Sequence, residues 1–254
     1  MKSRRPLRFV LFITLMALAA SLFLNFLLFN RARQYYVQLN GTRLDPLGVI
    51  YRDESWAAPL PPAPDALTVV FYGDSRAAEW PAPAVPGARI VNRAVHGQTT
   101  EQVRLRYGRH VAPLQPDVVL LQVGINDLKT IPLFPYLEEE IIARCQENIA
   151  AIVAEATAQG AIVILTTIFP VGTPPLERRV FWSDDITTAV STVNRQLATL
   201  AADNVLLFDA HTPLLAANGR LHPDFSLDEL HLNAAGYAAL DAGLLPTLTA
   251  LAAK

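Results

Sequence analysis

Residues 67–80 read LTVVFYGDSRAAEW, a short apolar run that ends abruptly in polar residues. The first six residues are rich in β-branched and aromatic side chains, which is typical of a buried β-strand. Gly73 interrupts the run, and Asp74, Ser75 and Arg76 follow it at once. Two interpretations are open: an ordinary turn in which Ser75 caps the next helix, or a turn that presents Ser75 for chemistry.

Four more apolar runs follow, at residues 88–94, 117–124, 161–168 and 204–210. Helical patterns lie between or after them, the clearest at residues 137–159, 184–202 and 233–252. Near-continuous apolar strands that alternate with helices predict an α/β fold, in which a parallel sheet is covered on both faces. Ligands in such folds bind beyond the carboxyl ends of the strands.

The N-terminus carries a second clear pattern. The basic segment MKSRRPLR precedes an apolar run from Phe9 to Phe29, which is long enough to cross a bilayer as one helix. Because the basic residues lie mostly on the leading side, we expect a cytoplasmic N-terminus and an exported domain in the periplasm or outside the cell. The alternative is a signal peptide cleaved near Ala17-Leu18-Ala19, which would leave a secreted protein. The apolar run continues well beyond that site, which favours an uncleaved anchor.

These patterns divide the chain into three predicted parts. Residues 1–30 form a cytoplasmic basic tip and a transmembrane signal anchor, residues 31–65 a juxtamembrane stalk, and residues 66–254 the exported domain. The stalk ends in the proline cluster APLPPAPD, a composition that predicts an extended spacer.

Composition excludes several classes of function. The formal net charge of −2 offers no electrostatic footprint for nucleic acid. Cys145 is the only cysteine, so an intrachain disulfide and a cysteine-rich metal site are excluded. His211 and His222 match no usual metal-ligand spacing and lie beside prolines in expected turns. We therefore expect neither a metal nor a cofactor, and the oligomeric state stays open.

Polar residues stand at the ends of the predicted strands, where a parallel sheet gathers them along one edge. Ser75 follows the first strand, residues 92–97 the second, and Gly124-Ile125-Asn126-Asp127 the third. Asp228 and His231 come after the last strand, three residues apart, a spacing that allows a direct hydrogen bond.

This set holds the parts that acyl transfer requires. A serine hydroxyl needs a base to remove its proton, and a histidine serves when a carboxylate holds its other ring nitrogen. Ser75 is the candidate nucleophile, His231 the base and Asp228 its orienting acid. Backbone N–H groups of Ser75 and Gly97, with the side-chain amide of Asn126, are the candidate oxyanion hole.

Four ordered blocks resemble the SGNH or GDSL hydrolase family: Gly73-Asp74-Ser75, Asn92 to Gly97, Gly124-x-Asn126-Asp127 and Asp228-x-x-His231. The resemblance covers roughly residues 67–245. It implies a flavodoxin-like three-layer α/β/α sandwich with a five-stranded parallel sheet, and ester or thioester hydrolysis without a metal. In this interpretation Asp74 and Asp127 support the site. The α/β-hydrolase alternative fails, because its nucleophile lies in Gly-x-Ser-x-Gly and its acid and histidine lie far apart.

Arg76 departs from the leucine that gives the family one of its names, and we expect this cation beside the nucleophile to influence substrate choice. His96 precedes Gly97 and is a second candidate for substrate contact. The loop at residues 169–185 follows the fourth strand, and a long loop at that edge is typical of a pocket wall or lid. Its candidate residues for substrate binding and specificity are Arg178, Arg179, Phe181 and Trp182; a solvated loop is the alternative.

The sequence thus predicts a membrane-anchored serine esterase. Its substrate would be an O-acetylated carbohydrate, a lysophospholipid or a small acyl ester. Two alternatives stay open. One is an O-acyltransferase on the same machinery, and the other is a catalytically idle binding module of the cell envelope.

Overall fold

Five parallel strands form one sheet, in the order β2-β1-β3-β4-β5, in a computed structural model that describes residues 5–50, 63 and 65–253. The strands are β1 (Leu67–Gly73), β2 (Ala88–Asn92), β3 (Val118–Gln122), β4 (Ile162–Thr166) and β5 (Val205–Phe208). The order reverses at β1, so the crevice beyond the ends of β1, β2 and β3 is the expected ligand site of a doubly wound sheet. All five predicted strands are confirmed: β2 to β5 lie within the ranges that the sequence indicated, and β1 extends one residue beyond its range, to Gly73.

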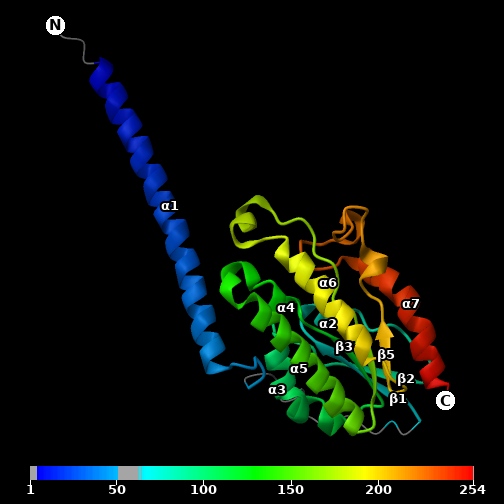
Figure 1. Cartoon of the computed structure of the whole chain (residues 1–254). Helices are drawn as coiled ribbons and strands as arrows, with labels where there is room; N and C mark the ends of the chain where they lie inside the picture. The colour runs from blue at the N-terminus through cyan, green and yellow to red at the C-terminus, as the bar shows by residue number, and fades with distance from the viewer. Residues whose placement is uncertain (1–4, 51–62, 64, 254) are drawn as a thin grey trace. The chain divides into compact units, whose positions relative to one another are not determined.

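Helices cover both faces of this sheet (Figure 1). One face packs against α3 (Thr100–His110), α5 (Glu138–Ala158) and α6 (Asp185–Leu197), and the other packs against α7 (Ala234–Ala252). Two short helices, α2 (Ser75–Ala78) and α4 (Ile125–Leu128), begin directly after β1 and β3. The predicted three-layer sandwich is confirmed.

Successive side chains of β1 point alternately into the two cores, one on each face of the sheet. Val70 and Tyr72 face α3, α5 and α6, whereas Val69 and Phe71 face α7, and all four are fully buried. Strands buried on both faces read as continuous apolar runs, which explains why the sequence revealed them so clearly.

Helix α3 is an element that the sequence pattern did not identify. It has a capping box at Thr99 and Gln102, but its buried face includes the charged Arg106 beside Val103 and Tyr107. The Arg106 guanidinium bonds the carbonyl oxygens of Gly73 and Arg93, so it ties the helix to the ends of β1 and β2. A buried cation weakens the apolar periodicity that signals a helix.

The N-terminal unit, described separately from the domain after it, consists mainly of one helix, α1 (Arg5–Leu44). Residues Leu7–Leu44 include a stretch apolar enough to cross a membrane, by length and composition, and a signal sequence passes the same test. The helix corrects the predicted stalk: residues 31–44 are helical, not extended. Residues 31–44 hold no proline or helix-ending signal before Gly41, so the helix continues past the apolar run. Most of the proline cluster falls outside the described residues.

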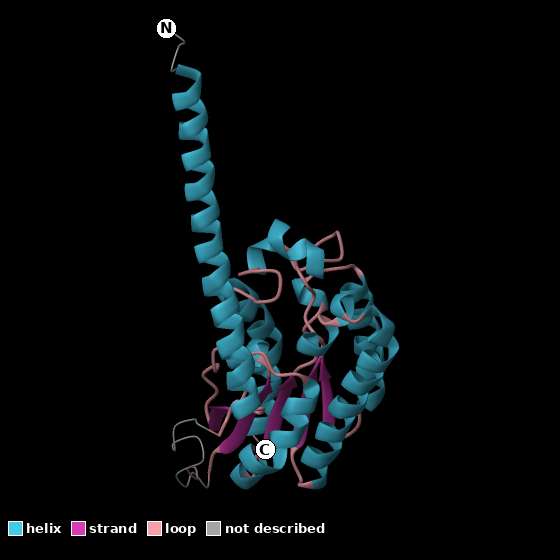
Figure 2. Ribbon diagram, turned by 90° about the vertical axis from the view of Figure 1, so that its left-hand side faces the viewer, coloured by secondary structure: helices cyan, strands magenta, loops and turns pink. Residues whose placement is uncertain are grey.

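Loops that follow the strands gather beyond their carboxyl ends (Figure 2). They include the turns after β1 and β3 and the longer connections at residues 93–99, 167–184 and 209–233. Every predicted site residue lies in one of these segments or in the short helices α2 and α4 that they lead into, so the fold brings them to one edge.

Candidate active site

The turn that carries Ser75 requires glycine at position 73. Gly73 has φ of 143°, and a Cβ atom there would lie 1.7 Å from the carbonyl oxygen of Gln122 on β3. Asp74 then caps α2, its Oδ1 accepting a hydrogen bond from the Arg76 N–H at 2.9 Å. Ser75 is therefore the first residue of a short helix, and its position follows from the close contact between β1 and β3.

Ser75, His231 and Asp228 form a continuous chain of hydrogen bonds. The distance from Ser75 Oγ to His231 Nε2 is 3.0 Å, and His231 Nδ1 lies 2.8 Å from Asp228 Oδ2. Asp228 Oδ1 also accepts hydrogen bonds from the backbone N–H groups of Leu230 and His231, both at 2.7 Å. Burial acts to raise the pKa of Asp228, but its bonds from His231 and these two N–H groups bring the pKa below its ordinary value. The carboxylate is thus held in its charged form beside the imidazole.

The candidate oxyanion donors lie in the neighbouring loops. Gly97 adopts a left-handed backbone with φ of 74°, where a side chain would be strained. Asn126, on α4, is buried and donates from Nδ2 to the Gln98 carbonyl oxygen at 3.0 Å. Within the described part of the chain, the N–H groups of Ser75 and Gly97 donate no hydrogen bond. The second Nδ2 hydrogen of Asn126 is likewise unassigned.

Asp127 connects two of the sequence blocks. Its two carboxylate oxygens accept hydrogen bonds from the N–H of Thr100 at 2.8 Å and from its hydroxyl at 2.6 Å. Thr100 is the first residue of α3, directly after the loop that carries Gly97. Burial raises the pKa of Asp127 to about 6, although the Thr100 bonds act to lower it. Asp74 is fully buried, and burial likewise raises its pKa to about 6 against the lowering effect of Arg76.

Replacing Asp127 with asparagine is expected to remove a pH dependence of stability. A carboxyl whose pKa is raised in the folded state keeps its proton there after the unfolded chain has lost it. Between about pH 4 and pH 6 this contribution to stability therefore falls as the pH rises, and it is largest in acid. Denaturant unfolding across that range should show wild type gaining stability relative to Asp127→Asn as the pH falls. A stability difference that stays constant would contradict the raised pKa.

Arg76 does not take the predicted role. Its side chain is fully buried, and its guanidinium donates to the carbonyl oxygens of Leu230 at 2.9 Å, Phe169 at 3.0 Å and Pro170 at 3.4 Å. It also lies over the Phe169 ring. The predicted substrate contact of Arg76 was wrong, because the side chain turns into the protein, where backbone acceptors surround it. It fixes the segment that carries His231 to the turn that carries Ser75.

The other predicted substrate contacts stay predictions. His96 is exposed and lies 3.4 Å from the Glu79 carboxylate. Phe181 is exposed at the end of the 3₁₀ segment η5 (Leu176–Phe181), whereas Trp182 is half-buried against the core. Arg178 of the same segment pairs with the buried Glu229, which follows Asp228 directly. This ion pair connects the loop to the candidate acid and base.

Three residues near the site were not predicted: Gln98, Lys129 and Glu229. Glu229 adjoins Asp228, and Lys129 lies three residues after Asn126, one helical turn away. These two spacings are the sequence signal that could have identified Glu229 and Lys129 as neighbours of the site.

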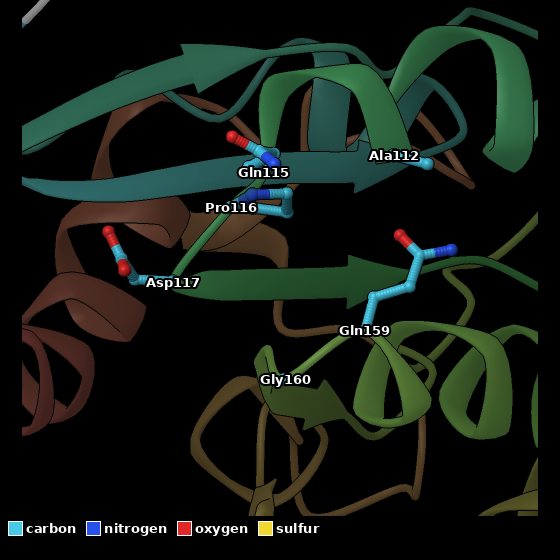
Figure 3. A pocket seen from close by; sticks show the side chains of 6 residues that line it. All are labelled: Ala112, Gln115, Pro116, Asp117, Gln159 and Gly160. Carbon is cyan, nitrogen blue, oxygen red and sulfur yellow. The ribbon is translucent and has the colours of Figure 1, made fainter.

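A surface pocket elsewhere is lined by Asp117, Gly160 and their neighbours, at the amino ends of β3 and β4 (Figure 3). It lies at the opposite edge of the sheet from Ser75 and is not part of this site.

Comparison with known proteins places this fold in a known family. The profile of the GDSL-like Lipase/Acylhydrolase family matches residues 54–239. A search of curated protein sequences gives no match.

Solved structures share the fold. A GDSL-like lipase from Bacteroides thetaiotaomicron has a TM-score of 0.63 at 22% identity, covering 78% of this chain and 95% of its own. An acetyl xylan esterase, AlAXEase, has a TM-score of 0.58 at 19% identity, covering 71% and 99%. An acetylxylan esterase from Geobacillus stearothermophilus has a TM-score of 0.53 at 20% identity, covering 70% and 92%. Since the family profile spans most of the chain and these structures share its fold, the chain belongs to the GDSL-like lipase/acylhydrolase family, whose members hydrolyse ester bonds.

Proposed function

We propose that this protein is a serine esterase that works through an acyl-serine intermediate, with Ser75 as nucleophile, His231 as general base and Asp228 as the acid that orients it. The observation that carries the proposal is the unbroken hydrogen-bonded chain from Ser75 Oγ through the imidazole to the Asp228 carboxylate. In the free protein the serine already lies within proton-transfer distance of its base, which is the geometry that nucleophilic catalysis requires.

The proposed reaction needs only these side chains, the oxyanion donors and one water molecule. Ser75 Oγ attacks the acyl carbonyl carbon while His231 Nε2 takes the hydroxyl proton, and the carbonyl oxygen becomes an alkoxide. The alkoxide is stabilised by the N–H groups of Ser75 and Gly97 and by the Asn126 amide. Its collapse expels the alcohol, which takes the proton from His231. A water molecule then gives a proton to His231 and attacks the acyl-serine. The second tetrahedral intermediate collapses as Ser75 Oγ leaves and takes the proton back from His231, which releases the acid and restores Ser75.

The proposed substrate is a small acyl ester of a carbohydrate. Two of the similar structures are acetylxylan esterases by description. A pocket beside the 169–185 loop is lined by Arg179, Trp182, Asp184 and Arg220, among others, a charged and aromatic lining that suits a sugar better than a fatty acyl chain. The loop is fixed to the segment of the candidate acid through the Gly172 N–H, which donates to the Glu229 carbonyl at 2.8 Å.

The apolar N-terminal helix supports the proposal that the domain is tethered to a membrane and faces the periplasm or the cell exterior. The basic residues that precede the apolar run favour this orientation. The envelope carbohydrates of that compartment are the substrate class that fits such a tether.

A substrate panel tests the function. The full chain in detergent is given p-nitrophenyl esters of acetate, butyrate and laurate, and an acetylated xylo-oligosaccharide. We expect the acetyl esters to have the highest kcat/KM; a laurate optimum would overturn the substrate class.

A fluorophosphonate probe should label the protein, with the modified peptide mapping to Ser75. Modification elsewhere, or none, would overturn the assignment of the nucleophile. Adding a free sugar acceptor and quantifying acetate against acetylated sugar separates hydrolysis from acyl transfer.

A further inference from the structure

Lys129 lies beside the candidate oxyanion hole. It directly follows the short helix α4, and its backbone N–H donates to the carbonyl oxygen of Ile125 at 2.9 Å. Its ammonium nitrogen lies 2.5 Å from Asn126 Oδ1, at the end of a half-buried side chain. Within the described residues, no carboxylate oxygen lies within 4.0 Å of that ammonium group. Its one direct side-chain partner is therefore the amide of Asn126.

The two neighbours of the Asn126 amide fix which way it points. The oxygen faces the Lys129 ammonium, a donor without acceptor capacity, and the nitrogen faces the carbonyl oxygen of Gln98, an acceptor. Turning the amide over would set its NH₂ group against the ammonium and its oxygen against the carbonyl. Both contacts would then be repulsive, so Lys129 and Gln98 hold the amide with its nitrogen as the donor.

The same contact strengthens that donor. A cation on the amide oxygen draws electron density from the nitrogen, which makes the remaining N–H a stronger hydrogen-bond donor. The charged groups around Lys129 are Asp74 after β1, Arg76 on α2, Arg178 on η5 and Glu229 beside the candidate acid. Burial lowers the pKa of Lys129, and the two cations add to that effect while the two carboxylates oppose it.

We propose that Lys129 is a positioning residue, which orients and polarises the Asn126 amide so that its free N–H stabilises the oxyanion formed on the substrate carbonyl. The inference rests on the proposed function, in which Asn126 belongs to the oxyanion hole. Lys129 does not touch the substrate: its effect reaches the reacting atoms through Asn126, and therefore falls on the transition state rather than on ground-state binding.

The test compares Lys129→Met, which keeps the length of the side chain without its charge, with Lys129→Arg, which keeps the charge. Loss of one oxyanion donor costs about a hundredfold to a thousandfold in kcat, so weakening one through Lys129→Met should cost about tenfold, with KM within about twofold. Lys129→Arg should keep most of the wild-type kcat. It should also keep its activity at alkaline pH where wild type loses it, because arginine does not deprotonate. The exposed Arg144→Met on α5 is the matched control.

A double-mutant cycle with Asn126→Ala makes the test independent of small structural effects. If Lys129 acts through Asn126, the Lys129→Met change should cost nothing further once the amide is removed. An unchanged kcat in Lys129→Met, or an equal cost in both backgrounds, would overturn the proposal. Failure of the proposed function itself looks different: wild type would then show no esterase activity that depends on Ser75.

Discussion

Ser75→Ala lowers kcat for acetyl-ester hydrolysis by about a thousandfold or more, because the substitution removes the atom that forms the acyl intermediate. KM should change little, since Ser75 is only 6% exposed and contributes little binding surface. Labelling by the fluorophosphonate probe should be lost completely. Steady-state kinetics and gel fluorescence on the same preparation measure both effects.

The matched control for this variant is Ser191→Ala on α6. Among the residues that the structure describes, the Ser191 hydroxyl bonds only the Thr187 carbonyl oxygen of its own helix, so that change should leave kcat and labelling at wild-type levels. Ser75→Ala should also keep its unfolding midpoint, because its hydroxyl has a single partner in the described chain, His231. Full labelling of the alanine variant would show that another residue carries the nucleophile.

Arg76→Leu is expected to lower the free energy of unfolding by about 2–4 kcal/mol, although leucine is the residue that names the family. A buried ion pair replaced on both sides by apolar groups is often neutral. Here, however, the acceptors are backbone carbonyls of Phe169, Pro170 and Leu230, which no side-chain change can remove. They would stay buried without a donor, at a cost of about 1–3 kcal/mol for each one that water does not reach.

The same substitution should also lower kcat, because Leu230 precedes His231 and loses its connection to the turn of Ser75. Guanidinium unfolding and steady-state kinetics measure the two effects. Arg144→Leu on the exposed face of α5 should leave the free energy of unfolding close to that of wild type. If Arg76→Leu matches that control in both measurements, the role given to the carbonyl bonds is wrong.

The sheet was predictable from sequence because its strands are buried on both faces and their apolar runs are continuous. The positions of Ser75, Gly97, Asn126 and His231 followed from one rule, that the carboxyl ends of parallel strands meet at one edge. The structure brings these residues to that edge, and their catalytic roles stay predictions.

The rest was not predictable, because it depends on where long polar side chains turn. Arg76 is adjacent to the nucleophile in sequence, yet it bonds carbonyls that lie 93, 94 and 154 residues away. No local pattern marks such acceptors. Helix α3 was not predicted for a related reason. The charged Arg106 lies on its buried face and interrupts the apolar pattern on which helix prediction depends. The end of α1 at Leu44 was missed because the extended conformation that the proline cluster predicts was assigned to the whole of residues 31–65.

The bonds of Arg76 have a consequence for how the domain unfolds. Binding loops often open locally at little cost, while the core behind them stays intact. Here the segment with His231 is tied through a fully buried side chain to the Phe169 region, whose ring packs against Trp80 in the core beneath α7. Leu232, which follows His231, is buried in the same core, so releasing the histidine requires breaking contacts of that core. The candidate catalytic centre belongs to the cooperative folding unit of the domain.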